Sequence, residues 1–283
     1  MIGNLIYDIG MNNGDDTAYY LQRGFRVIAV EANPALVSQA MQRFEREVAE
    51  DRFVVLNVGI TEQPGKLRFW ICETHPEWSS FDQGIASRDG CPHHAITIAC
   101  RRFGSLLEEY GVPYYLKVDI EGNDLLCLQD LKAGDLPKYV SVEATDINLL
   151  TVLRDLGYTR FKCVSQFNFL PLEVPPSREQ RYQEQVRRLL CSERFWLRVV
   201  RRLGLRRWLT SQMNRNRRLQ DHVFSWGSSG AFGEDLLGRW QSFEEMWNTY
   251  RHFQQLQENG EPSLFWYEKD FSFWSDFHSR RDG

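Results

Sequence analysis

The chain has 283 residues, of which 42% are hydrophobic and 25% are charged, and its formal net charge is −4. This composition is typical of a globular protein and excludes a disordered, fibrous or strongly basic chain. No apolar run approaches the roughly 20 residues that a membrane-spanning helix needs. The N-terminus carries no basic-then-apolar signal sequence, so we expect a cytoplasmic protein. The cysteines at positions 72, 91, 100, 127, 163 and 191 form no CxxC pair, which predicts reduced thiols.

The first 34 residues predict a nucleotide-binding βαβ unit. Residues 5–8 form an apolar strand, residues 10–14 a turn with glycines, and Asp15, Asp16 or Thr17 can begin a helix. Glycines in such a turn let the backbone approach a ligand closely. A second strand over residues 27–30 ends in Glu31, about 20 residues after the turn, where a carboxylate can accept hydrogen bonds from both ribose hydroxyls.

Two details favour S-adenosylmethionine (AdoMet) over a dinucleotide as the ligand of this unit. The turn Gly10-Met11-Asn12-Asn13-Gly14 lacks the second and third glycines of the pyrophosphate-binding pattern. In addition, Asp8 at the end of the first strand would repel a pyrophosphate but attract the sulfonium and ammonium groups of AdoMet. The alternative for Asp8 is a structural role, as a helix cap or as the ion-pair partner of an arginine.

Strands and helices continue to alternate through residue 164, as in a parallel α/β sheet. We expect strands over residues 53–57, 66–72, 96–101, 115–119, 139–142 and 161–164, and helices over residues 35–48, 103–110, 125–131 and 147–156. Residues 73–95 are polar and lack periodicity, which predicts a mobile loop. Asp8, Glu31, Asp119 and Glu143 all stand at strand ends, and this edge of an open α/β sheet binds ligands.

The C-terminal third has a different character. Residues 177–259 are expected to be mostly helical. We therefore predict an AdoMet-binding domain over residues 1–172 and a mostly helical extension over residues 173–283, which could bind the acceptor, act as a lid or form a homodimer.

The extension contains a basic element, Arg194–Arg218. It lies within the wider segment from Arg187 to Arg218, which contains eleven arginines and a single acid, Glu193. Residues 194–207 predict an amphipathic helix whose basic face is either simply solvated or binds an anionic acceptor or a membrane. Nucleic acid is the least favoured partner, because the chain contains no base-reading motif and is acidic elsewhere.

The segment Lys117-Val-Asp119-Ile-Glu121-Gly122-Asn123-Asp124, with the turn over residues 8–14 and the segment Val30–Pro34, resembles the FkbM-type AdoMet-dependent methyltransferases. The resemblance covers about residues 5–165, and Ser229–Glu234 and Phe273–His278 resemble tail motifs of some members. It implies a class I methyltransferase fold, in which a seven-stranded sheet has a reversed last strand. It also implies O-methylation of a glycan or a natural product.

The resemblance further implies a set of cofactor-binding residues. These are Asp8, Gly10, Asn12, Gly14 and Thr17 beside the methionine end, Glu31 and Ala32 at the ribose, Asn57 and Val58 near the adenine, and Asp119. The chain departs from the family at Met11, where a small residue is common, and it has no helices before the first strand. We therefore expect residues 73–95 and the C-terminal helices to supply the lid.

Catalysis is assigned to Lys117, Asp119, Glu121 and Glu143. The alternate spacing of the first three places them on one face of a continuing strand. We expect Lys117 to pair with Asp119. Glu121 or Asp119 is the expected general base, with Lys117 orienting it. Two alternatives stay open: the cluster is a structural salt-bridge network, or Asp119, Glu121 and Glu143 bind Mg²⁺.

Other functions remain in competition with hydroxyl methylation. One is methylation of a peptide side chain, including an amide nitrogen, in a ribosomal peptide pathway, where the basic element would bind an acidic leader. Another is a nicotinamide-dependent oxidoreductase, which the turn and Asp8 disfavour. A third is an inactive binding module that has kept the fold.

Overall fold

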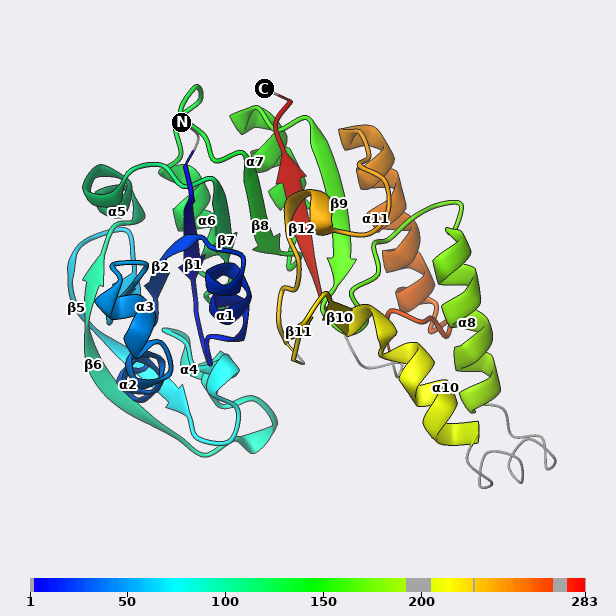
Figure 1. Cartoon of the computed structure of the whole chain (residues 1–283), viewed down its shortest axis with the longest axis horizontal. Coiled ribbons are helices and arrows are strands. Elements are labelled where there is room, and N and C mark those ends of the chain that lie inside the picture. The colour runs from blue at the N-terminus through cyan, green and yellow to red at the C-terminus, as the bar shows by residue number, and fades with distance from the viewer. Residues whose placement is uncertain (1–2, 192–204, 226, 267–273, 283) are drawn as a thin grey trace. The chain divides into compact units, whose positions relative to one another are not determined.

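The computed structural model describes residues 3–191, 205–225, 227–266 and 274–282 (Figure 1). The chain divides into two compact units. Unit 1 comprises Met1–Glu143, Thr151–Tyr158 and Arg280–Gly283, and unit 2 comprises Ala144–Leu150 and Thr159–Ser279. Most of the predicted amphipathic helix over residues 194–207 lies outside the described residues.

Five parallel strands form the centre of unit 1. They are β1 (Leu5–Ile9), β2 (Arg26–Val30), β3 (Phe53–Leu56), β7 (Tyr115–Val118) and β8 (Tyr139–Glu143). β1 and β7 are almost entirely buried, as expected for parallel strands that are covered on both faces. The full sheet has seven strands in the order β3-β2-β1-β7-β8-β12-β9, which confirms the predicted α/β class.

The helices between these strands largely match the predicted segments. They are α1 (Asp15–Gln22), α2 (Pro34–Arg43), α3 (Glu45–Ala49), α5 (Phe103–Tyr110), α6 (Asp124–Gln129) and α7 (Asn148–Leu156). The predicted helix over residues 35–48 is interrupted at Phe44, whose φ of −113° and ψ of 28° are not helical. The Phe44 ring packs edge-on against Phe53, with 5.0 Å between ring centroids, so burial of this ring accompanies the break.

Successive side chains of β1 point to opposite faces of the sheet. The Tyr7 hydroxyl donates to the carbonyl oxygens of Leu106 and Gly111, at 3.0 and 2.7 Å, in and after α5. The next residue, Asp8, accepts a hydrogen bond from Thr17 in α1. α5 and α1 therefore lie on opposite faces of β1, as the two-residue period of a strand requires.

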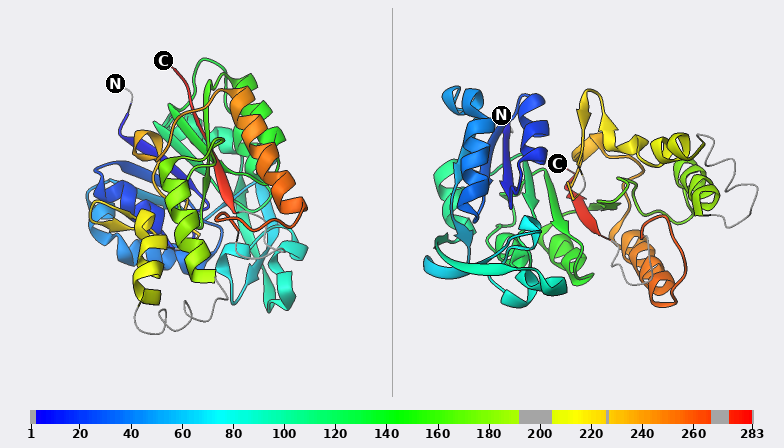
Figure 2. Two further views of the ribbon diagram at one scale, coloured as in Figure 1. Left: turned by 90° about the vertical axis from the view of Figure 1, so that its right-hand side faces the viewer. Right: turned by 90° about the horizontal axis from the view of Figure 1, so that it is seen from below.

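A smaller sheet in unit 1 has the strand order β4-β6-β5, with β4 (Gly59–Ile60), β5 (Gly65–Cys72) and β6 (His93–Arg101). Figure 2 shows this sheet in cyan and teal. Between β5 and β6 the chain forms η1 (Pro76–Trp78), α4 (Gln83–Ala86) and η2 (Arg88–Gly90). The segment over residues 73–95, predicted to be a mobile loop without regular structure, contains three helical turns and the start of β6.

The expectation of reduced thiols is wrong for two of the six cysteines. Cys72 and Cys91 form a disulfide with a Cα–Cα distance of 6.2 Å. The antiparallel pairing of β5 with β6 places Cys72 opposite His93, which brings Cys91 within bonding distance. The spacing of the cysteines does not indicate this pairing, because the pairing depends on the hairpin register.

The disulfide predicts a stability effect that a single substitution can measure. It closes a loop with a sequence separation of 19 residues, and chain-entropy arguments give about 3 kcal/mol for a loop of this size. We expect Cys72→Ser to lower the free energy of unfolding by about this amount in denaturant titrations. The control is Cys191→Ser, at an exposed free thiol; equal effects of the two substitutions would contradict the prediction.

Unit 2 contains the helices α8 (Arg178–Cys191), α10 (Arg206–Met213) and α11 (Phe243–Glu258). It also contains the strands β9 (Arg160–Ser165) and β12 (Ser275–Arg280, whose last residue belongs to unit 1), a small β10–β11 ribbon (Arg218–Leu219 and His222–Val223), and the short turns η4 (Arg215–Arg217) and η5 (Gly233–Asp235).

The reversed last strand implied by the family resemblance is confirmed. β12 runs opposite to its neighbour β9 (Figure 1). β12 lies in the C-terminal tail and contains residues 275–278 of the Phe273–His278 motif. None of the helices in the described ranges is long and apolar enough to cross a membrane.

Candidate functional site

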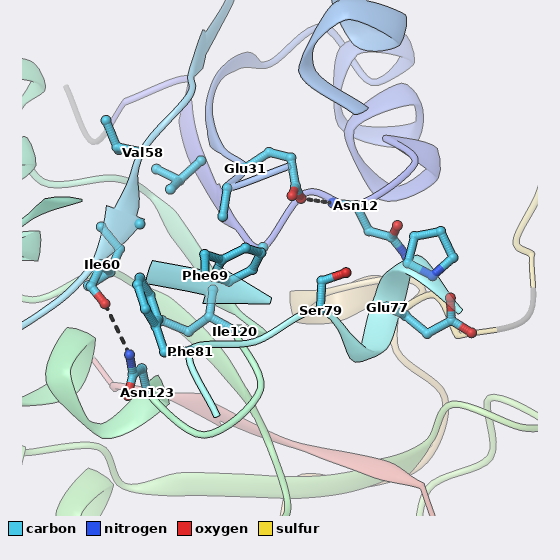
Figure 3. A pocket seen from close by; sticks show the side chains of 15 residues that line it. Asn12, Glu31, Val58, Ile60, Phe69, Glu77, Ser79, Phe81, Ile120 and Asn123 are labelled. Carbon is cyan, nitrogen blue, oxygen red and sulfur yellow. Dashed lines mark hydrogen bonds between the residues drawn. The ribbon is translucent and has the colours of Figure 1, made fainter. Parts of the chain in front are cut away.

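A pocket of about 530 Å³ lies at the carboxyl ends of β1 and β2 in unit 1 (Figure 3). Its lining comes from the turns after strands and from the β5–η1 segment: Gly10, Asn12, Val30, Glu31, Ala32, Val58, Gly59, Ile60, Phe69, Pro76, Glu77, Ser79, Phe81, Ile120 and Asn123. Five of the predicted cofactor-binding residues are in this lining, namely Gly10, Asn12, Glu31, Ala32 and Val58.

The turn after β1 is shaped by residues with left-handed backbone. Gly10 has a φ of 85° and Gly14 a φ of 75°. A Cβ atom on Gly10 would lie 1.7 Å from the carbonyl oxygen of Asp119, so no other residue fits without displacing the end of β7. The sequence predicted that this glycine makes room for a ligand, whereas the structure also requires it for the packing of the turn against β7.

Glu31 is the central polar group of the pocket. One carboxylate oxygen accepts a hydrogen bond from the backbone N–H of Asn12 at 2.8 Å (Figure 3). The other accepts one from the backbone N–H of Asn33 at 2.7 Å. Burial raises the pKa of Glu31 to about 7, although these two N–H groups act in the opposite direction. Each oxygen has a further lone pair, so the carboxylate can accept hydrogen bonds from a ligand.

Asn57 supports this part of the pocket from outside the lining. Its side-chain amide donates to the carbonyl oxygens of Glu31 at 2.9 Å and Ala32 at 3.1 Å. Asn57 therefore holds the chain that follows β2, while the neighbouring Val58 lines the pocket.

The apolar walls come from the small sheet and its hairpin. The rings of Phe69 and Phe81 pack edge-to-face, with 5.1 Å between centroids (Figure 3). The Asn123 side chain donates to the Ile60 carbonyl oxygen at 3.2 Å and ties the α6 end of the pocket to β4. An aromatic and aliphatic lining around one buried carboxylate suits the adenosine part of AdoMet.

Asp8 lies outside the pocket lining and belongs to a buried polar network. One of its oxygens accepts a hydrogen bond from the Thr17 hydroxyl at 2.6 Å, and the other accepts one from Lys117 Nζ at 3.2 Å. Asp8 is completely buried and Lys117 is 3% exposed. The structural alternative for Asp8 named an arginine as the ion-pair partner, whereas the structure pairs Asp8 with Lys117.

Lys117 is the hub of this network. Its Nζ also donates to the Gly10 carbonyl oxygen at 3.0 Å and lies 3.8 Å from Asp119 and 3.9 Å from Asp16. Burial alone would lower the pKa of Lys117, but the charges of Asp8, Asp119 and Asp16 raise it well above its usual value. The lysine therefore stays protonated, and its shortest carboxylate contact is with Asp8 rather than with the predicted partner Asp119.

Two acidic residues after β7 have raised pKa values. Burial raises the pKa of Asp119, and the positive charge of Lys117 opposes this effect. Burial, followed by the negative charge of Asp119, raises the pKa of Glu121 to about 7. Glu121 adopts a left-handed backbone with a φ of 48°, a conformation that is uncommon outside glycine and is often found at functional sites.

The remaining predicted residues lie apart from the pocket. Gly14 contacts Phe44 rather than the pocket, since a Cβ atom there would meet the ring at 3.0 Å. Glu143 ends β8, is partly buried and is not in the lining. In the described part of the chain no group of three or more acidic, histidine or cysteine side chains could hold a metal ion, so the magnesium alternative gains no support.

Several pocket residues were not singled out from the sequence. Pro76, Glu77, Ser79 and Phe81 come from the segment that the sequence marked as a lid, without residue-level assignments. Asn123 stands inside the Lys117–Asp124 motif, so its position in that motif was a usable signal. For Arg88, which lies 3.5 Å from Glu121, the sequence carried no signal.

A family model described as Methyltransferase FkbM domain matches residues 8–191. Among solved structures, the chain is similar to Methyltransferase FkbM from Methylobacillus flagellatus KT, with 17% identity, a TM-score of 0.36 and coverage of 53% of this chain and 36% of that one.

It is also similar to precorrin-6y C5,15-methyltransferase from Geobacter metallireducens GS-15, with 16% identity, a TM-score of 0.31 and coverage of 57% of this chain and 67% of that one. A third similar structure is the Haemonchus contortus phosphoethanolamine N-methyltransferase 2 in complex with S-adenosyl-L-methionine, with 9% identity, a TM-score of 0.37 and coverage of 99% and 49%. The chain thus spans about a third of the first structure's length and about half of the third's. No curated protein matched it.

Proposed function

The chain belongs to the FkbM methyltransferase family, and from this premise we propose that it transfers the methyl group of AdoMet to a hydroxyl of a glycan or a natural product. Membership of the family supports methyl transfer, and the hydroxyl acceptor is the further part of the proposal. The observation that carries the proposal is the pocket at the strand ends, where the buried Glu31 carboxylate lies among apolar walls and Glu121 lies beside Ile120 of the lining.

The cofactor is held, in this proposal, by residues of unit 1. Glu31 accepts hydrogen bonds from the ribose hydroxyls, because each of its oxygens retains a lone pair after binding a backbone N–H. Phe69, Phe81 and Val58 provide the apolar surface for the adenine. Asp8 and Lys117 act indirectly, by fixing the turn after β1 through the Gly10 carbonyl oxygen.

Bound AdoMet supplies a methyl group on a sulfonium, a leaving group that needs no further activation. The protein then has to orient the acceptor, exclude water and accept the proton of the hydroxyl. Glu121 is the proposed base, since its pKa of about 7 lets it be ionised and still accept a proton near neutral pH. Asp119 is the second candidate, and its contact with Lys117 favours its ionised form.

The described part of the basic element supports an anionic acceptor. Arg206, Arg207 and Arg218 are exposed on unit 2. By contrast, Arg215 is paired with Glu179, and Arg217 donates to the Phe224 carbonyl oxygen. Guanidinium groups bind carboxylates and phosphates through paired hydrogen bonds, so we include acidic sugars and phosphorylated or carboxylated natural products in the acceptor class.

Replacing Glu31 with glutamine tests the cofactor site. The glutamine NH₂ group would face one of the two backbone N–H donors of Asn12 and Asn33, and the charged acceptor for the ribose would be lost. Hydrogen bonds to charged groups contribute about 1.5–3 kcal/mol, so we expect AdoMet to bind about 10- to 100-fold more weakly. Calorimetric titration with AdoMet measures this change.

The control is Glu73→Gln, because Glu73 pairs with His94 and is not in the pocket lining. Wild-type affinity is expected for this variant. The wild-type protein is titrated with S-adenosylhomocysteine and NAD under the same conditions. Binding of NAD in place of the two adenosyl ligands would reject the cofactor assignment, as would an unchanged AdoMet affinity in Glu31→Gln.

A further inference from the structure

The segment between β5 and β6 makes two contacts with Glu121 that the proposed function leaves unexplained. The Ser80 hydroxyl donates to the backbone carbonyl oxygen of Glu121 at 3.0 Å. The Arg88 guanidinium lies 3.5 Å from the Glu121 carboxylate. One contact therefore holds the backbone of the proposed base, and the other engages its side chain.

Both contacts come from a segment that is anchored on the small sheet. Ser80 is 2% exposed, and its backbone exchanges hydrogen bonds of 2.9 and 3.0 Å with Trp70 in β5. Arg88 lies in η2, and its carbonyl oxygen accepts a hydrogen bond from the N–H of Cys91, which is bonded to Cys72. The backbone of Arg88 is therefore tied to β5 through hydrogen bonds and a disulfide.

The charges around Glu121 are mostly negative. Asp119 and Asp124 face it from the end of β7 and the start of α6, and Glu77 faces it from η1. Burial and these three acids raise the pKa of Glu121, whereas Arg88 lowers it. The Glu121 side chain is 12% exposed, so the arginine acts on a carboxylate with little access to water.

We propose that Arg88 is a positioning residue that fixes the Glu121 side chain and favours its ionised form. The catalytic consequence of this role rests on the proposed function, while the ion pair itself does not. Without Arg88, the surrounding acids favour the protonated form of Glu121, which cannot accept a proton from an acceptor hydroxyl. Arg88 is about half exposed, so it can be replaced without leaving a buried cavity.

The test follows the titration of Glu121 directly by carbon NMR, on full-length protein labelled with ¹³C at the glutamate side-chain carboxyls. The resonance is assigned by its loss in Glu121→Gln. We expect its titration midpoint to rise in Arg88→Gln and to return close to the wild-type value in Arg88→Lys, which keeps the positive charge. The matched control is Arg68→Gln on β5, because Arg68 lies over the Trp70 ring rather than near Glu121.

Methyltransferase activity provides a second measurement once an acceptor substrate has been identified. The acidic limb of the kcat profile is expected to move to higher pH in Arg88→Gln, with AdoMet affinity within about twofold of wild type. An unmoved midpoint in Arg88→Gln would overturn the role of Arg88 and leave the methyltransferase proposal intact. Conversely, a wild-type protein that binds no AdoMet would overturn the proposed function, and a moved midpoint would still support the ion pair.

Discussion

Replacing Asp8 with alanine is expected to lower the free energy of unfolding by about 3–5 kcal/mol, because it leaves a buried lysine without its shortest ion-pair partner. Lys117 is 3% exposed and retains carboxylates only at 3.8 and 3.9 Å. The Thr17 hydroxyl also loses its acceptor. We expect AdoMet binding to be lost as well, as a consequence of the disturbed turn. Chemical denaturation and calorimetric titration measure the two effects.

A conservative variant separates structural damage from a direct contact with the cofactor. Asp8→Asn removes the charge but keeps a side-chain oxygen that can accept a hydrogen bond from Thr17 or Lys117, and it leaves the contact between Lys117 and the Gly10 carbonyl oxygen in place. If Asp8 acts through the fold, Asp8→Asn loses less stability than Asp8→Ala, and AdoMet affinity recovers with the stability. If the stability recovers while the affinity stays lost, Asp8 contacts the cofactor and its role is not indirect.

Replacing Glu121 with glutamine is expected to reduce kcat about 10²- to 10⁴-fold, the usual contribution of a general base. AdoMet affinity should stay within about twofold, because Glu121 is outside the pocket lining. Since the pKa of Glu121 is about 7, the wild-type rate should rise as the pH increases through 7, where the carboxylate loses its proton. The variant should lack this acidic limb.

The measurement uses transfer of a radiolabelled methyl group to hydroxyl-bearing glycans and natural products, with acidic members included. The control is Glu73→Gln, which neutralises a carboxylate that pairs with His94 outside the pocket lining and should retain most of the activity. Wild-type turnover in Glu121→Gln would transfer the role of base to Asp119. Labelling of peptides alone would instead favour the ribosomal-peptide alternative.

The catalytic cluster shows which contacts residue spacing can predict and which it cannot. The alternation of Lys117, Asp119 and Glu121 predicted that all three lie on one face. β7 ends at Val118, however, and Glu121 adopts a left-handed backbone, so strand geometry does not extend to it. The shortest ion pair of Lys117 is with Asp8, 109 residues away. Such a pairing depends on which strands are neighbours, and spacing within one motif does not contain that information.

The sequence by itself determined the α/β class, the positions of the parallel strands and the acid after β2, because buried parallel strands require continuous apolar runs and the strand ends require polar groups. The tertiary structure decided which of those acids reach a pocket. It placed Glu31 in the lining and buried Asp8 against Lys117. It also formed the Cys72–Cys91 disulfide and the contacts of Ser80 and Arg88 with Glu121. These contacts join residues distant in sequence, and hairpin register and strand order, which no local pattern encodes, set their distances.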